Sequence, residues 1–203
     1  VLIGFESLNP ESLREMRKRW NKVSGPYSSV VRALHRRGIG IYGTFVFGYD
    51  LDRVESFERT VEFAVRHRFY LANFNPLTPT PAAPLYDRLH HEGRLIHDRW
   101  WIDPRFRYGD ATFHPRGMTA DQLTAGCYRA RTAFNTARSI VYRAWDPRTT
   151  LRSPRRFAQY AISNLISRRE IHKKQGLALG GPEPLIVPPE SSADAPIDID
   201  TVA

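Results

Sequence analysis

The sequence predicts an α/β protein built around parallel strands. Three short apolar segments with the pattern of strands alternate with segments whose capping residues and periodicity predict helices. Alternation of this kind is typical of a parallel sheet. Three strands do not close a barrel, so they predict either half of a TIM-like parallel barrel or a small open sheet. After about residue 95, aromatic and proline-containing segments are followed by long helices.

The first strand is predicted over Val1–Phe5, and a helix near residues 10–19 follows it. A capping residue, a proline suited to the first helical position and an acid in the first turn predict the start of this helix. These three residues are Asn9, Pro10 and Glu11. A second helix is predicted from Pro26 to Gly38, a residue type that commonly ends helices.

The second strand is predicted within residues 39–49, which are apolar on both faces, as in a strand buried inside a parallel sheet. Asp52 is then predicted to cap a helix near 53–67, with Glu55 three residues later as in a capping box. Residues 69–74 form the third predicted strand, which leads into a proline-rich turn. The sequence therefore predicts three βα units.

The second half of the chain is predicted to be mainly helical. A helix near 83–92 precedes an irregular aromatic segment, and a capping box of Thr119 and Gln122 starts a long helix near 120–145. A last helix is predicted over 154–174, with one face formed by Phe157, Ala161 and Leu165. We therefore divide the chain into a βα region, 1–95, a helical extension, 96–175, and a disordered acidic tail, 176–203.

Composition limits the class of protein. The 203 residues contain no apolar run near the roughly 20 residues that span a bilayer. They contain one cysteine, Cys127, which excludes an internal disulfide, and a cytoplasmic location is the default expectation. The chain starts with Val1, inside a predicted strand and without methionine, so we expect a fragment of a longer protein.

The charge is strongly basic and unevenly distributed. The formal net charge is +9, and residues 128–175 hold twelve bases against two acids. One interpretation is a non-enzymatic protein that binds an acidic partner or nucleic acid. No nucleic-acid motif accompanies the charge, so solvated helix surfaces are the favoured interpretation.

Polar residues follow each predicted strand, where parallel α/β folds bind ligands. The three segments are Gly4–Ser7, Gly48–Asp52 and Asn75–Thr80. Each segment taken alone is also explained by a helix terminus, a cap or a turn. A further hypothesis is a small enzyme that uses Glu6 and Asp50 as an acid–base pair.

Taken together, the strand-end segments resemble a known family. The stretches VLIGFESLNPESLREM, GIYGTFVFGYDLD and FNPLTPTPAAPLYDRLHHEGRL are similar to the fourth, fifth and sixth strands of the radical S-adenosylmethionine (radical SAM) barrel. They resemble the branch with an upstream cobalamin-binding domain, and RWWIDPRFRYGDATFHPRGMTADQL resembles its C-terminal extension. The resemblance covers about residues 1–175 and implies half a barrel plus this extension.

The resemblance implies a partial SAM site. The turn after the family's fourth strand lies beside the ribose and amino-acid end of SAM, and Gly4, Glu6 and Ser7 match it. The family's fifth strand presents backbone and apolar side chains to the adenine. The matching residues are Phe45, Val46, Phe47 and Gly48. The family's Pro-Gly-Thr-Pro turn is replaced here by residues 81–84, which read Pro-Ala-Ala-Pro.

The expected substrate contacts come from the sixth-strand turn and the extension. They are Asn75, Thr78, Trp100 and Trp101, although the aromatic residues are also explained by packing under a long loop. No catalytic residue is assigned. The resemblance implies reductive cleavage of SAM, with methyl transfer through cobalamin or a radical rearrangement, in a full-length relative.

Radical SAM chemistry needs three cysteine thiolates around a 4Fe-4S cluster. This chain has only Cys127, in a predicted helix, and we interpret it as a buried helix residue. The seven histidines are scattered, and His90 and His91 lie on different helix faces, so no metal is assigned. The resemblance thus implies that the cluster and cobalamin belong to a missing upstream polypeptide, which an electron-donor protein would reduce. The chain alone is expected to be inactive.

Overall fold

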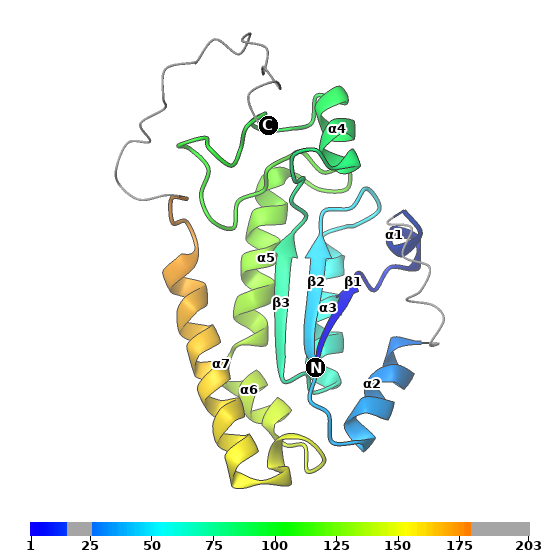
Figure 1. Cartoon of the computed structure of the whole chain (residues 1–203), viewed down its shortest axis with the longest axis vertical. Coiled ribbons are helices and arrows are strands. Elements are labelled where there is room, and N and C mark those ends of the chain that lie inside the picture. Colours follow the sequence, from blue (N-terminus) through cyan, green and yellow to red (C-terminus); the bar gives the residue numbers. More distant parts are fainter. Residues whose placement is uncertain (16–25, 180–203) are drawn as a thin grey trace, which may run out of the picture.

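The computed structural model describes residues 1–15 and 26–179 (Figure 1). The end of the first predicted helix and the tail beyond residue 179 lie outside these ranges. In chain order the elements are β1 (Leu2–Glu6), α1 (Pro10–Glu15), α2 (Tyr27–Arg36), β2 (Tyr42–Phe47), α3 (Glu55–Arg66), β3 (Leu71–Pro76), α4 (Pro84–His91), α5 (Ala120–Phe134), α6 (Ala137–Ala144), the short 3-10 helix η2 (Thr150–Arg152) and α7 (Pro154–Lys174).

The three predicted strands form one parallel sheet in the order β1-β2-β3. Gly4 pairs with Thr44, which in turn pairs with Asn73, and the register of β2 against β3 is regular to the end of both strands. Between β1 and β2 the register shifts after Gly4, so that Glu6 faces Phe45. The carboxyl ends of all three strands therefore lie at one edge of the sheet, as the sequence predicted.

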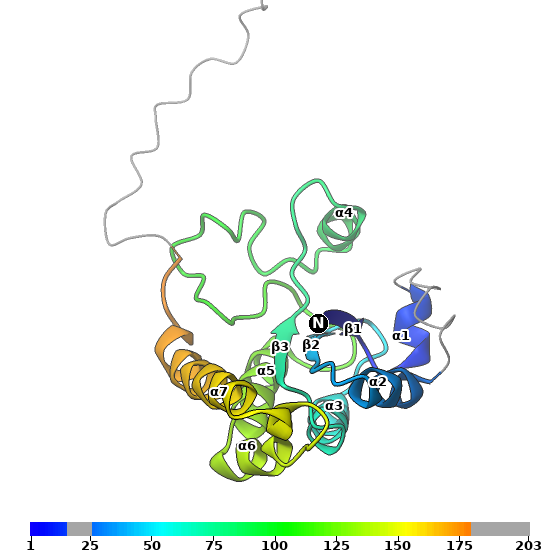
Figure 2. The same ribbon diagram turned by 60° about the horizontal axis from the view of Figure 1, so that its bottom comes forward.

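Helices cover one face of this sheet. α3 packs on β2, and α5 packs on β3 and on α3 (Figures 1 and 2). Side chains alternate accordingly, because successive residues of a strand point to opposite faces. Phe45, Phe47 and Phe74 are buried against the helices, whereas Thr44 and Asn73 stay partly exposed on the other face. We call this second surface the open face. The prediction that β2 is buried on both faces is therefore wrong for the described residues.

An aromatic cluster forms the core under the helices. Phe5, Phe45 and Phe74 follow one another across the sheet, with ring centroids 5.5 and 5.6 Å apart. Phe69 joins them from the loop before β3, and Gly43 leaves the space that its ring occupies. Burial of several phenylalanine side chains, each worth about 1.5–3 kcal/mol, supplies much of the stabilisation of this layer.

A buried arginine joins the C-terminal helices to the sheet. Arg143 of α6 has no exposed surface, and burial lowers its pKa to about 10. Its guanidinium donates hydrogen bonds to main-chain and side-chain oxygens of α5, α6, α7 and the loop before β3, and it lies 3.7 Å from the centre of the Phe134 ring. The acceptors are the carbonyls of Phe69, Tyr70 and Phe134, Ser139 Oγ and Asn164 Oδ1.

Two helical predictions need correction. The single helix predicted over 120–145 is interrupted at Asn135 and Thr136, and Thr136 caps the new helix α6 by accepting from the Ser139 amide. The capping box that starts α5 is confirmed. The apolar face predicted for α7 is largely exposed, with 61% of Leu165 accessible, and the helix is instead buried at Tyr160 and Asn164.

Asp52 does not cap α3. The residue that precedes this helix is Val54, which makes no capping hydrogen bond from its side chain. Asp52 is buried, and its carboxylate accepts from the Gly48 and Tyr49 amides at 3.0 and 3.2 Å and from Ser12 Oγ at 3.2 Å. The carboxylate therefore fixes the loop after β2 and ties it to α1. In the described ranges, no helix is both long and apolar enough to cross a membrane.

Candidate functional site

Polar side chains gather on the open face near the carboxyl ends of the strands. Thr44 on β2 and Asn73 on β3 are register partners, and Asn75 is the partner of Val46 one step nearer the end. Thr44, Asn73, Asn75 and the apolar Val46 are all partly exposed on the open face. Because hydroxyl and amide groups both donate and accept hydrogen bonds, this surface suits a polar ligand.

Glu6 lies over the β1 side of this surface. Its φ angle is 63°, a left-handed conformation that non-glycine residues seldom adopt, and it follows the irregularity in the β1 register. Its Oε1 atom lies 2.7 Å from the position that a Cβ on Gly4 would occupy, and Thr44 Oγ1 lies 3.7 Å from the same point. Glycine at position 4 thus leaves space for the carboxylate to fold back beside the Thr44 hydroxyl. Gly4 and Glu6, both predicted SAM contacts, are brought together.

Two other predicted SAM contacts support loops. Ser7 is buried, and its hydroxyl accepts from the Asn9 amide at 3.0 Å, which stabilises the turn before α1. Gly48 has a φ angle of 109°, and its amide is bound by Asp52. A Cβ at Gly48 would lie 2.9 Å from a methyl group of Leu123, so the glycine allows close approach of α5.

Of the four residues predicted to face the adenine, Gly48 follows β2, and the other three are divided between the two faces of the strand. Val46 lies on the open face, two residues beyond Thr44. Phe45 and Phe47 are buried against the helices, with 0% and 3% of their surface exposed. Their side chains therefore belong to the core, and only Val46 presents an apolar side chain to the open face at this level of the strand.

Of the predicted substrate residues, Asn75 lies near the end of β3, and Thr78, Trp100 and Trp101 lie beyond it. Thr78 is exposed, and its hydroxyl donates to the Pro76 carbonyl at 3.3 Å. Trp100 Nε1 donates to the Pro79 carbonyl at 3.0 Å, and the Trp100 ring contacts Trp101. Trp100 thus binds the proline-rich turn and helps to fix its position beside the carboxyl edge of the sheet, and Trp101 packs against Trp100 and Tyr86.

The same turn contains a residue in a conformation suited to glycine. Ala82 has a φ angle of 63°, which costs an L-residue other than glycine about 1 kcal/mol or more. The resemblance to the Pro-Gly-Thr-Pro turn places glycine at this position. The backbone shape is therefore retained while the residue that would adopt it freely is absent.

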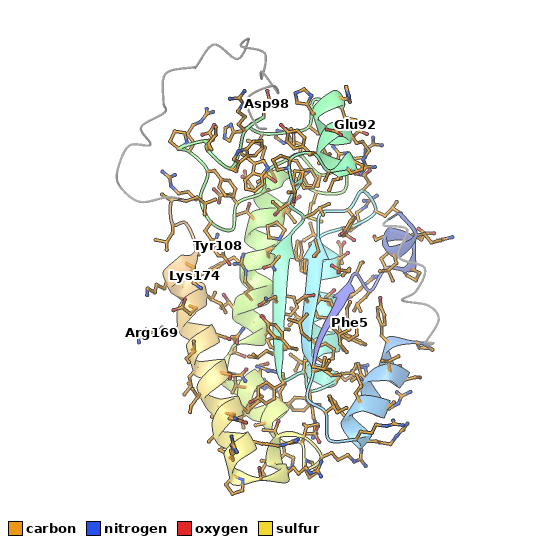
Figure 3. The ribbon with its side chains drawn as sticks, in the orientation of Figure 1. Phe5, Glu92, Asp98, Tyr108, Arg169 and Lys174 are labelled. Atoms are coloured by element: carbon orange, nitrogen blue, oxygen red, sulfur yellow. The ribbon has the colours of Figure 1, made fainter. Side chains whose placement is uncertain are left out.

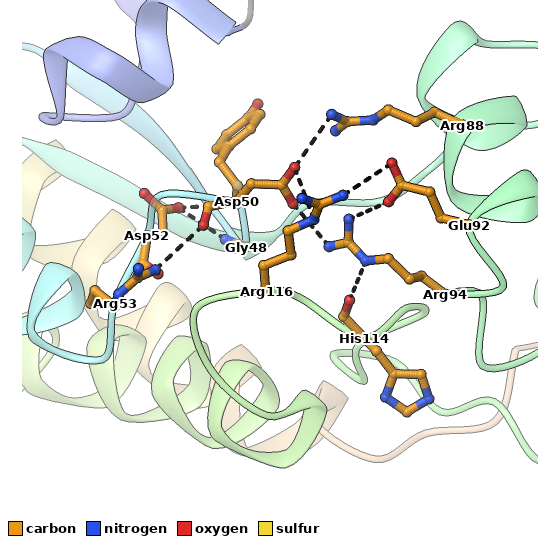
Figure 4. Close-up of polar contacts among 10 residues, drawn as sticks. Gly48, Asp50, Asp52, Arg53, Arg88, Glu92, Arg94, His114 and Arg116 are labelled. Atoms are coloured by element: carbon orange, nitrogen blue, oxygen red, sulfur yellow. Dashed lines mark hydrogen bonds and ion pairs between the residues drawn. The ribbon is translucent and has the colours of Figure 1, made fainter.

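Asp50 is held in an ionic cluster (Figure 4). Its carboxylate lies 2.9 Å from Arg94 Nη2, 3.3 Å from Arg88 Nη1 and 3.7 Å from Arg116 Nε. Arg94 and Arg116 also bind Glu92, and the hydrogen bond from Arg94 lowers the pKa of Glu92. Three guanidinium groups bind the Asp50 carboxylate, so this side chain is committed to a structural ionic cluster, which disfavours the hypothesis that it forms an acid–base pair with Glu6.

A cavity of about 320 Å³ opens beside β3 on the open face. Asn73 and Asn75 line it from the sheet, and Arg131 and Asn135 line it from α5 and its C-terminal end. Within the described part of the chain, Arg131 Nη2 and Asn135 Oδ1 are buried without a hydrogen-bond partner. Figure 3 shows Tyr108 and Lys174, which also line the cavity, at the adjoining end of α7.

Sequence reasoning missed Thr44, Asn73, Arg131 and Asn135. A period of two along β2 and β3 places Thr44 and Asn73 on the same face as Val46, and that signal was present in the sequence. No local signal identifies Arg131 or Asn135, because both are placed by the packing of α5 against β3.

Cys127 does not suit an iron–sulfur cluster. It lies within α5, fully buried, and burial raises the pKa of its thiol to about 12. Cluster ligands are thiolates, and a raised pKa opposes their formation. Among the described residues, no three histidine, cysteine or acidic side chains are grouped so that they could hold a metal ion. The interpretation of Cys127 as a buried helix residue is confirmed.

Burial of Cys127 predicts a loss of stability at alkaline pH. The thiol titrates near 9.0 when unfolded and near 12 when folded, so between these values the folded state keeps a proton that the unfolded state has lost. The stabilisation is complete below pH 9 and falls as pH rises, by about 1 kcal/mol at pH 10. Urea unfolding at pH 7, 8, 9 and 10, followed by circular dichroism, measures this decline.

The Cys127→Ala variant provides the comparison for this measurement. It should be less stable at pH 7 because of the smaller side chain, yet decline less between pH 8 and 10 than the wild type. Burial also raises the pKa of Tyr160 to about 12. Because tyrosine titrates near pH 10 when unfolded, Tyr160 causes a smaller decline of stability near pH 10 in both the wild type and the variant. Equal declines in the two proteins would show that the folded thiol titrates normally.

The amino-acid sequence was compared with those of known proteins, and parts of bacterial methyltransferases are similar to it. No protein-family model matches the chain. Bacteriochlorophyllide d C-12(1)-methyltransferase of Chlorobaculum tepidum is 36% identical over 121 residues, which are 60% of this chain and 25% of that protein. Hopanoid C-2 methylase of Rhodopseudomonas palustris is 34% identical over 98 residues, 48% of this chain and 18% of that protein.

A third relative is bacteriochlorophyllide d C-8(2)-methyltransferase of Chlorobaculum tepidum, 25% identical over 100 residues, 49% of this chain and 22% of that protein. The matched region spans a quarter or less of the length of each relative. The chain is therefore similar, over about half of its residues or more, to part of three bacterial enzymes named for methyl transfer.

Proposed function

We propose that this chain forms part of a radical SAM methyltransferase of the branch that carries an upstream cobalamin-binding domain. The observation that carries the proposal is the open face, where Glu6 folds over Gly4 beside Thr44 at the carboxyl edge of a parallel sheet. The similarity to three methyltransferases supports the same reaction class. The chain would contribute one wall of the SAM pocket.

The residues of the open face fit SAM. The carboxylate of Glu6 can accept hydrogen bonds from ribose hydroxyls or from the ammonium group of the amino-acid end. Thr44 and Asn73 can donate to or accept from the same polar end, and Val46 can contact the adenine. Bound SAM supplies a methyl group or, when reduced, a deoxyadenosyl radical. The role of this chain is to bind and orient SAM.

The residues do not fit a 4Fe-4S cluster, because the only cysteine of the chain is buried in α5. We propose that an upstream polypeptide supplies the cluster and the remaining strands. In the described residues β1 is an edge strand, and the face beside it carries Gly4 and Glu6. An added parallel strand on β1 would satisfy its outer edge and enclose the open face.

The cavity beside β3 is proposed as part of the substrate site. Arg131 and Asn135 present a donor and an acceptor at its α5 side, and Asn75 lies on the sheet side. A substrate that carries a carboxylate or hydroxyl group near the methylated carbon fits this pair. The proline-rich turn and Trp100 would cover the adjacent edge.

Binding of SAM to the chain tests the proposal directly. In isothermal titration calorimetry the wild type should bind SAM, and Glu6→Gln should weaken binding by about tenfold, the value of a charge-assisted hydrogen bond. Glu58→Gln on the exposed surface of α3 is the matched control and should leave binding unchanged. Equal affinity of the Glu6→Gln variant and the wild type would refute the assigned SAM contact.

The missing cluster has its own test. After anaerobic reconstitution with iron and sulfide, the chain should show no iron–sulfur absorbance and should form no 5′-deoxyadenosine from SAM. Either signal in preparations free of contaminating enzymes would contradict the proposal that the cluster lies on another polypeptide.

A further inference from the structure

A second cavity lies at the opposite end of the sheet from the SAM-binding surface. Its volume is about 390 Å³, within the range of small-ligand sites. The end of α2, the α3–β3 loop and the segment after α6 line it. Because α2 and α3 each lead into the amino end of a strand, this cavity is independent of the proposed SAM site.

The lining of this cavity is strongly basic. Five of the side chains are arginines: Arg32, Arg36, Arg66, Arg68 and Arg148. Asp146 is the one carboxylate in the lining, and it is already bound. Its oxygens accept from the Arg148 amide at 3.0 Å and from Thr149 Oγ1 at 2.8 Å, and His35 Nδ1 lies 3.5 Å away.

Basic residues at the ends of α2 and α3 would complement the helix dipoles in any protein. Two helix C-termini contribute about one negative charge together, and Asp146 adds another. Glu62, which binds Arg66 at 2.6 Å, adds a third. Five guanidinium groups exceed this total, and Arg148 comes from a segment outside both helices. The cavity therefore keeps a surplus of positive charge.

The positive charge of this lining also affects the pKa values of two histidines. Burial is the main cause that lowers the pKa of His67, and Arg32 and Arg66 lower it further. Burial also lowers the pKa of His35, which Asp146 partly opposes. Both imidazoles are therefore mainly neutral at pH 7 in the free protein. An anion in the cavity would favour their protonated forms.

We propose that this cavity binds a small anion with two linked phosphate groups, such as a diphosphate or a nucleoside diphosphate. Guanidinium groups bind phosphate oxygens in pairs, and arginines from three separate segments can surround two adjacent phosphates. In the described chain, Arg36 and Arg148 are exposed and have no carboxylate partner. Arg32 is also exposed, but it donates to Ser29 Oγ at 3.2 Å, so Arg36 and Arg148 are the exposed arginines of this lining assigned to bind the ligand.

Calorimetric titration of the full chain with inorganic pyrophosphate at pH 7 and about 50 mM salt tests the proposal. One pyrophosphate should bind per chain, and the double variant Arg36→Gln/Arg148→Gln should bind it about tenfold or more weakly. Arg129→Gln/Arg169→Gln removes the same charge from exposed sites on α5 and α7 and should change affinity by less than about twofold. Adenosine diphosphate, titrated in parallel, distinguishes a nucleotide site from one for free diphosphate.

Nuclear magnetic resonance of the wild type gives a second measurement that needs no variant. Pyrophosphate should raise the titration midpoint of His67, whereas sodium chloride at equal ionic strength should not. Equal loss of affinity in both double variants, or displacement of pyrophosphate by a ten-nucleotide single strand that both variants bind equally, would overturn the proposal in favour of a general polyanion surface. An unmoved His67 would also overturn it. SAM binding should be unchanged in both double variants, so this result stands apart from the proposed function.

Discussion

Replacement of Arg143 by Met is expected to destabilise the chain by about 3–5 kcal/mol, a large fraction of the stability of an ordinary domain. The side chain is fully buried and binds the carbonyls of Phe69, Tyr70 and Phe134. Methionine can fill the volume but donates no hydrogen bond. The main-chain carbonyls cannot be removed, so they would stay buried, and each acceptor left without a donor costs about 1–3 kcal/mol.

Urea unfolding followed by circular dichroism measures this effect. Arg138→Met lies on the same helix at an exposed position and should change stability by less than about 0.5 kcal/mol. Arg143→Lys keeps the charge but lacks the forked donors, so it should also be strongly destabilised. If Arg143→Met unfolds at the wild-type urea concentration, the hydrogen-bond network around the guanidinium contributes no net stability.

Local signals predicted the βα region well. Apolar runs identified all three strands, and the capping box at Thr119 identified the start of α5. Contacts between distant residues were not predictable in the same way. Asp52 has the sequence position of a helix cap, yet its carboxylate binds Ser12, forty residues earlier, and two loop amides. A capping pattern does not show whether tertiary structure offers the carboxylate stronger partners.

The sequence predicted some residues of the candidate site correctly and placed others on the wrong face of the sheet. The motif resemblance led to Gly4 and Glu6, which lie together on the open face. It also led to Phe45 and Phe47, because a run of apolar residues does not show which alternate positions face the helices. The pairing of Thr44 with Asn73 settles that question, since strand register brings the two polar residues side by side.

The second large effect is expected at Gly126, where α5 crosses α3. A Cβ at this position would lie 2.3 and 2.4 Å from two ring atoms of Phe57, closer than any real contact. Phe57 is buried, and its ring packs 4.5 Å from that of Phe47, so it has little freedom to move. Gly126→Val should therefore destabilise the chain by about 3 kcal/mol, although valine has a higher helix propensity than glycine.

A double-mutant cycle separates this clash from other causes. Phe57→Leu removes the ring atoms nearest Gly126, and alone it should cost about 1 kcal/mol through lost burial. If steric overlap is the cause, Gly126→Val combined with Phe57→Leu should be about 1–2 kcal/mol more stable in urea unfolding than the sum of the single effects predicts. Additive effects would show that the loss of stability in Gly126→Val comes from the backbone of α5 rather than from overlap with the Phe57 ring. The close approach of α5 to α3 places Arg131 and Asn135 beside the open face. The sign of the coupling thus tests whether this close approach depends on the absence of a side chain at position 126.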